Sequence, residues 1–143
     1  MATSNRAAWV VMQSKLQAMG YGSVVIGEPR TGDADGIIAL IPADGHYDES
    51  VLDAPREIHR VSIRMYRSWL AQPQDEVEFE LDKFRAGILE DIAGDFDIGG
   101  EVAYYMPGET EWEFGEAEVG ETLYRIIDIT VAYRVDERAT FVE

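Results

Sequence analysis

Residues 57–68 read Glu-Ile-His-Arg-Val-Ser-Ile-Arg-Met-Tyr-Arg-Ser, and apolar and polar side chains alternate along this stretch. A period of two places successive side chains on opposite faces of an extended strand. One face is apolar and is expected to pack against a core; it carries Val61, Ile63 and Met65. The other face is polar and carries Arg60, Ser62, Arg64 and Tyr66.

Residues 123–135 form a second, longer alternating stretch. We expect one face to point inward, with Leu123, Ile127, Ile129, Val131 and Tyr133. The opposite face is expected to point outward, with Tyr124, Asp128, Thr130 and Arg134. Long strands with one apolar and one polar face are typical of antiparallel sheets.

Two amphipathic helices are expected. In residues 4–19, Ser4 or Asn5 can act as the N-cap. The apolar side chains then recur at spacings of three and four: Ala8, Trp9, Met12, Leu16 and Met19. In residues 73–94, Pro73 suits the first helical position and acidic residues follow in the first turn. The apolar stripe of this second helix is Val77, Leu81, Phe84, Ile88 and Ile92.

The remaining segments complete an α+β pattern. The apolar runs 23–26 and 37–41 are expected to be strands, which could form a hairpin, and polar residues 42–55 an exposed loop. A further strand is expected over residues 97–106, ended by Pro107-Gly108. Because helices and strands do not alternate regularly, a doubly wound fold is excluded. Residues 1–143 are predicted to form one domain: a two-layer sandwich of a mixed, mainly antiparallel sheet with both helices on one face.

Composition narrows the class of protein. The chain has 12 Lys and Arg against 28 Asp and Glu, a formal charge of −16, which disfavours binding to nucleic acid or anionic lipid. The absence of cysteine excludes disulfides and thiolate chemistry. The longest apolar run, residues 37–41, is far shorter than the roughly 20 residues of a membrane span. The N-terminus also lacks a signal-peptide pattern, so export is not expected.

No catalytic, cofactor-binding or metal-binding set of residues is predicted, and we expect a protein that is not an enzyme. Gly32-Asp-Ala-Asp-Gly36 resembles the start of a calcium loop, but the Glu required at its twelfth position is missing, so a solvated turn is expected. The two histidines, His46 and His59, do not stand in a pattern with a nucleophilic serine. A small cytoplasmic enzyme or regulatory domain would require a ligand-filled apolar pocket around His59.

Two charged segments are candidates for protein contacts. The first is a cluster of Arg56, Arg60, Arg64 and Arg67. These side chains either pair within the chain, with Asp128 and neighbouring carboxylates, or meet the acidic face of a neighbouring subunit. The second is residues 108–122, either a solvated loop or hairpin or a segment that contacts a partner and lines a channel. Its candidate residues are Glu109, Glu111, Trp112, Glu113, Phe114, Glu116 and Glu118.

The order of these elements resembles that of tail terminator, or tail completion, proteins of long-tailed bacteriophages. The resemblance covers most of the chain and rests on Arg60-Val-Ser-Ile-Arg-Met-Tyr-Arg67, the helix at 73–94 and Tyr124-Arg-Ile-Ile-Asp-Ile-Thr-Val-Ala-Tyr-Arg134. It implies a structural virion protein without catalytic residues or cofactors. Such a protein would close into a six-fold ring on the last ring of the tail tube, end tube polymerisation and join the tail to the head.

The resemblance also implies the partners and the location. The partners would be further copies of this chain, the tail tube protein and the head-tail connector protein. DNA would pass through the ring without specific binding. From the formal charge of −16 we expect that part of the acidic excess faces the channel and repels the phosphates of the DNA. The protein would be made in the host cytoplasm and end at the head-tail junction of the virion. The alternative is a neck or head-completion protein between portal and tail.

Overall fold

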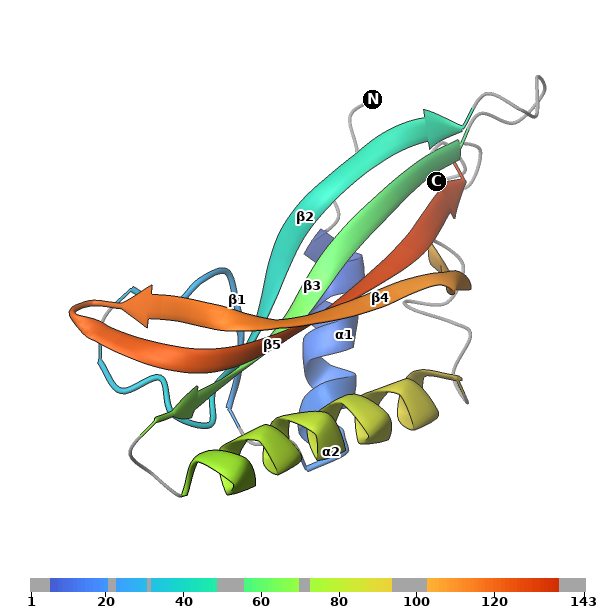
Figure 1. The fold of residues 1–143 in the computed structure, drawn as a ribbon. Helices are drawn as coiled ribbons and strands as arrows, with labels where there is room; N and C mark the ends of the chain where they lie inside the picture. Colours follow the sequence, from blue (N-terminus) through green and yellow to red (C-terminus); the bar gives the residue numbers. More distant parts are fainter. Residues whose placement is uncertain are drawn as a thin grey trace.

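The computed structural model describes residues 6–20, 23–30, 32–48, 56–69, 73–93 and 103–136. Its elements, in chain order, are α1 (Arg6–Ala18), β1 (Val24–Ile26), β2 (Ile38–Asp48), β3 (Arg56–Ser68), α2 (Gln74–Ala93), β4 (Ala103–Val119) and β5 (Thr122–Asp136) (Figure 1). Both predicted helices and both long alternating strands are confirmed, with ends that differ by a few residues.

The strands form one mixed sheet in the order β1-β2-β3-β5-β4. β1 is parallel to β2, whereas the other neighbouring strands are antiparallel. The central strands β3 and β5 pair without interruption from Arg56 opposite Asp136 to Ser68 opposite Tyr124. The predicted fold class, an α+β sandwich with a mainly antiparallel sheet, is confirmed.

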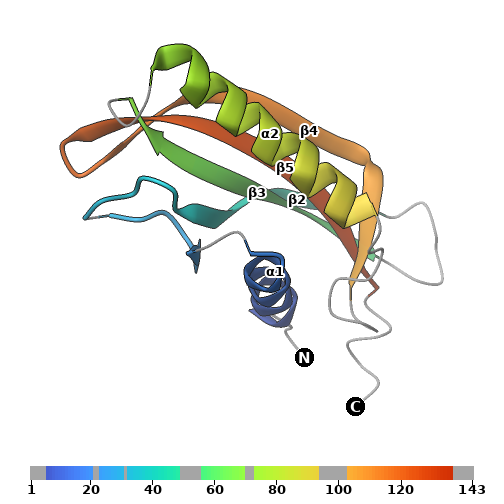
Figure 2. The same ribbon diagram turned by 90° about the horizontal axis from the view of Figure 1, so that it is seen from below.

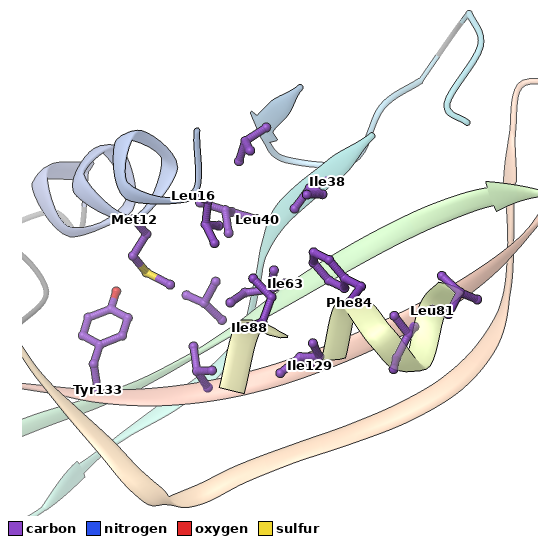
Figure 3. Packing of buried hydrophobic residues seen from close by; sticks show 14 of the residues in the cluster. Met12, Leu16, Ile38, Leu40, Ile63, Leu81, Phe84, Ile88, Ile129 and Tyr133 are labelled. Carbon is purple, nitrogen blue, oxygen red and sulfur yellow. The ribbon is translucent and has the colours of Figure 1, made fainter. Parts of the chain in front are cut away.

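Both helices pack on the same face of the sheet, as predicted. One apolar cluster joins Met12 and Leu16 of α1 to Leu81 and Ile88 of α2, and to residues 61 and 63 of β3 and residues 127, 129, 131 and 133 of β5. Figure 2 shows α2 lying across the strands, and Figure 3 shows Met12 beside Tyr133 and Phe84 near Ile63. Each large side chain buried in this way stabilises the fold by about 1.5–3 kcal/mol.

The start of the sheet differs from the prediction in two respects. The predicted hairpin between the runs 23–26 and 37–41 is wrong, because β1 pairs with β2 in parallel, with Val24 opposite Ile38. The exposed loop is wrong for residues 42–48, which continue β2, whereas residues 49–55 lie outside the described part of the chain. A register shift between Pro42 and Gly45 accommodates the proline within the strand. A Cβ atom at Gly45 would lie 2.8 Å from the carbonyl oxygen of Ile58, so only glycine fits there.

Strand β4 is also longer than predicted. Residues 97–102 lie outside the described part, and Pro107-Gly108 does not end the strand, which continues to Val119. The pairing with β5 shifts register between Met106 and Glu111. Proline is tolerated because β4 is an edge strand, where a missing N–H can fall on the unpaired side.

The two faces of β5 are predicted correctly except next to the hairpin turn. Leu123 was expected to point into the core and is 44% exposed, whereas Tyr124 was expected to point outward and is buried. The turn of the β4-β5 hairpin extends past the first residues of α2, so no helix covers that end of the sheet (Figure 1). Tyr124 is buried on the opposite face, in a second cluster with Ala34, Tyr66 and Ile126.

Candidate docking surface

The sheet face opposite the helices is here called the open face. Away from the apolar cluster around Tyr124, it is polar over β3, β5 and β4. It carries a hollow of about 420 Å³. The side chains of β3 and β5 that line it are Ser62, Arg64, Asp128 and Thr130, and β4 adds Glu111 and Glu113. The side chains of a strand alternate between the two faces of the sheet. In β3 and β5 the residues that line the hollow are therefore even-numbered, whereas those in the core are odd-numbered.

Arg64 and Asp128 form the central ion pair of the open face. Arg64 Nε lies 2.7 Å from Asp128 Oδ1 and Nη2 lies 3.0 Å from Oδ2, and Ser62 Oγ donates a hydrogen bond of 2.7 Å to Oδ1. Burial lowers the pKa of Arg64, but hydrogen bonds to Asp128 and Tyr66 outweigh it and raise the pKa above its usual value. The guanidinium is therefore permanently charged and fixed in place, and Asp128 has no free charge to offer a ligand.

The structure divides the predicted arginine cluster between the two faces of the sheet. Arg60 lies near Asp44 and Glu111 at 3.4 and 3.1 Å, whereas Arg67 pairs with Asp35 and with Glu80 of α2 at 3.3 and 3.0 Å. The side chain of Arg56 lies outside the described part, although its backbone pairs with β5. Pairing within the chain, one of the two predicted outcomes, is therefore present for Arg60, Arg64 and Arg67.

Strand β4 presents the predicted acidic segment along the outer edge of the sheet. Trp112 and Phe114 share one face, as expected for an extended segment, since both lie opposite core residues of β5, Ile129 and Ile127. Trp112 is 49% exposed, with the guanidinium of Arg85 4.7 Å from its ring, while Phe114 packs against the core.

The carboxylates of β4 outnumber the cations beside them. Glu111 pairs with Arg60, but within the described residues the side chains of Glu109, Glu113, Glu116 and Glu118 form no hydrogen bond or ion pair. Glu113 lies directly opposite Asp128 in the ladder, so two like charges are cross-strand neighbours. Such an arrangement is unfavourable unless a cation lies beside it. The outer edge of the sheet is therefore a surface with an excess of negative charge.

The Gly32–Gly36 turn uses its carboxylates within the chain. Asp35 Oδ1 accepts a hydrogen bond of 2.8 Å from the N–H of Ser68, and Asp33 Oδ1 accepts bonds from the N–H of Asp35 and the hydroxyl of Tyr124. The Tyr124 hydroxyl also accepts one from the N–H of Ala34. In the part of the chain that the structure describes, no group of three or more acidic or histidine residues could hold a metal ion. The turn therefore packs over Tyr124 through Ala34, while Gly32 and Asp33 are exposed to solvent as the predicted turn requires.

His59 packs into the sheet. Its Nε2 lies 3.1 Å from Glu57 Oε1, and its ring stacks on Tyr133 with a centroid distance of 5.5 Å. A second hollow, of about 600 Å³, lies beside α2 and is lined mainly by Lys83, Phe84, Gly87 and Met65. Neither this hollow nor the one on the open face is lined by His59.

The chain matches no family model, and no curated protein matches its sequence. Within the described residues, no helix is long and apolar enough to cross a membrane. The fold and the surface described above therefore carry the functional argument.

Proposed function

We propose that this chain is a structural subunit of a long-tailed bacteriophage, which caps the tail tube as a ring, ends tube polymerisation and joins the tail to the head. The observation that carries the proposal is the long acidic edge of β4 beside an open face that neither α1 nor α2 covers. An exposed edge strand is a template for pairing with another chain. A subunit that works by fitting against neighbours needs such a surface.

The charges suggest which residues contact a neighbouring subunit. Cyclic rings are built from two different patches on each copy. Of the candidate arginines, Arg60 is the most available, because its partners Asp44 and Glu111 are 63% and 75% exposed and such pairs contribute little. Arg64 is held by Asp128 and would have to break a well-formed pair. We therefore place the subunit contact of the basic strand at Arg60.

Electron microscopy of tail tubes tests the proposal. Tubes of the encoding virus, polymerised from purified tube protein with and without this chain, are expected to be shorter when it is present and to carry a ring at one end. Light scattering of the protein alone measures whether the ring exists beforehand. Binding to DNA-filled heads without binding to tubes would contradict the terminator role and support the neck-protein alternative.

A further inference from the structure

We infer that the outer edge of β4, residues 111–118, is a docking site for an extended basic segment of a partner protein, which adds to the sheet as a further strand. The inference concerns the chemistry of this edge and holds whether or not the protein works in a phage tail. The side chains of β4 determine the pattern of cationic and apolar residues that the occupant needs.

No described strand pairs with the outer edge of β4. β4 is the outermost strand, and from Glu111 to Val119 its ladder with β5 has no register shift. In an antiparallel pair, the N–H and C=O groups of one residue point toward the partner strand, and those of the next residue point away from it. Val119 and Thr122 flank a two-residue turn and so form a bonded pair. Counting back from them, the residues that face away from β5 are Trp112, Phe114, Glu116 and Glu118.

The side chains of β4 specify the occupant. On the open face the order along the strand is Glu111, Glu113, Gly115, Ala117. On the helix face the order is Trp112, Phe114, Glu116, Glu118. Residues directly opposite one another on adjacent strands interact, and opposite charges are favourable there. The complementary segment therefore reads cation, apolar, cation, apolar, apolar, cation, apolar, cation. This order is the same in both directions, so the charges match a parallel or an antiparallel strand.

A basic partner fits better than a second copy of this chain. Two copies paired through this edge would place the glutamates of one β4 beside those of the other. The arginines of β3 and β5 with the most fixed positions, Arg64, Arg67 and Arg125, already pair with carboxylates of their own chain. A cation beside Glu113 would extend the charged row that runs from Arg64 through Asp128 across the open face. Acidic side chains on an edge strand also oppose pairing between copies.

Two synthetic peptides of identical composition test the pattern. The matched probe is acetyl-Lys-Val-Lys-Thr-Thr-Lys-Val-Lys-amide, and the control is acetyl-Lys-Val-Lys-Thr-Lys-Val-Lys-Thr-amide. As a parallel strand the control places cations opposite Gly115 and Ala117, and as an antiparallel strand it places them opposite Trp112 and Phe114. Fluorescence anisotropy is expected to show that the matched probe binds at least about tenfold more tightly at low ionic strength, with affinity falling as salt rises. Equal affinity of the two peptides would overturn the inference, because it would show attraction to the acidic surface without strand addition.

Hydrogen exchange followed by NMR tests strand addition itself. The matched probe is expected to slow exchange of the amides of residues 112, 114, 116 and 118, while those of 113, 115 and 117, already bonded to β5, change little. Adjacent residues of a strand point their N–H groups to opposite edges. A matched probe that is N-methylated at two adjacent residues therefore lacks a donor on each edge, and it is expected to lose binding. Binding that survives N-methylation would contradict the inference.

Substitutions at Glu116 separate charge from backbone. Glu116→Gln removes the charge and keeps the outward N–H, whereas Glu116→Pro removes both and leaves the β5 ladder intact. We expect Glu116→Gln to weaken binding of the matched probe about three-fold and Glu116→Pro to weaken it at least about tenfold. Circular dichroism checks that both variants keep the fold. Equal effects of the two would argue against strand addition. A concentration-dependent dimer of the unaltered chain that Glu116→Pro abolishes would show that a second copy is the occupant.

Discussion

Arg64 and Asp128 lie directly opposite one another on β3 and β5, and two nitrogens of the guanidinium contact the two carboxylate oxygens at 2.7 and 3.0 Å. Their side chains are 19% and 25% exposed, so water screens the pair only in part. This ion pair holds both side chains in place at the centre of the open face, beside the acidic strand β4.

Removing the anion of this pair is expected to destabilise the fold. Asp128→Asn leaves the Arg64 guanidinium with only the more exposed carboxylate of Glu28, 3.4 Å away, and should lower the free energy of unfolding by about 1–3 kcal/mol. Glu111→Gln is the matched control, because it neutralises an exposed carboxylate paired with Arg60, and should cost less than about 0.5 kcal/mol. Urea denaturation measures both. Similar losses for the two variants would show that the central pair is no stronger than a surface one.

Replacing both partners tests whether the pair itself stabilises the fold. The double variant Arg64→Leu with Asp128→Val removes both charges and supplies β-forming side chains. We expect it to be within about 1 kcal/mol of the unaltered chain, since a partly buried ion pair contributes little net stability. A loss larger than that of Asp128→Asn alone would show a net stabilising role for the pair.

Gly45 is expected to tolerate no side chain. In Gly45→Ala the new methyl group would meet the carbonyl oxygen of Ile58 at 2.8 Å, so the register shift in β2 would have to rearrange. We expect a loss of about 1–3 kcal/mol in the free energy of unfolding. The control is Gly108→Ala in the register shift of β4, where no atom lies within 4 Å of the added carbon. Thermal unfolding followed by circular dichroism compares them, and equal stability of both variants would contradict the assigned register.

Tyr133, which is buried on the helix side of β5, is expected to make the free energy of unfolding depend on pH in the alkaline range. Burial raises the pKa of Tyr133 to about 12, against the opposing effect of the hydrogen bond that Trp9 Nε1–H donates to its hydroxyl at 2.9 Å. In the unfolded chain the phenol ionises near pH 10. Between pH 10 and 12 the unfolded state therefore binds fewer protons than the folded state, and stability falls as pH rises.

Tyr133→Phe tests this linkage. At neutral pH the variant should lose about 0.5–1.5 kcal/mol, because the indole N–H of Trp9 loses its acceptor. Between pH 10 and 12 its stability should fall less steeply than that of the unaltered chain, by up to about 1.4 kcal/mol for each pH unit. Urea denaturation at a series of pH values measures both slopes. Parallel pH profiles would show that Tyr133 does not keep its proton in the folded state.

The Gly32–Gly36 turn is expected to loosen when its anchor is removed. Tyr124→Phe deletes the hydroxyl that contacts the N–H of Ala34 and the carboxylate of Asp33 while leaving the ring in its cluster. Hydrogen exchange should accelerate at Ala34 with little change in the core. Asp82→Asn on the exposed side of α2 serves as a control. Unchanged exchange at Ala34 would show that the hydroxyl does not hold the turn.

Local periodicity predicted most of the fold. The alternation in residues 57–68 and the three- and four-residue spacing from Val77 to Ile88 specify strand and helix because each depends on neighbouring residues only. The pairing of Arg64 with Asp128 was predicted as one of two outcomes, since opposite charges stood on the polar faces of two expected strands. The acidic content of β4 was likewise visible in the sequence, together with the shared face of Trp112 and Phe114.

Long-range pairing decided the rest. No local signal sets β1 parallel to β2, extends β2 past Pro42 or buries Tyr124 beneath residues 32–36, because each depends on segments that meet only in the folded chain. The sequence by itself determined both helices, the two central strands and how acidic the chain is. Only the tertiary structure decided which strand lies at the outer edge, since strand order follows from how all the apolar faces are buried together. That order leaves the glutamates of β4 beside a backbone edge that no described strand pairs with.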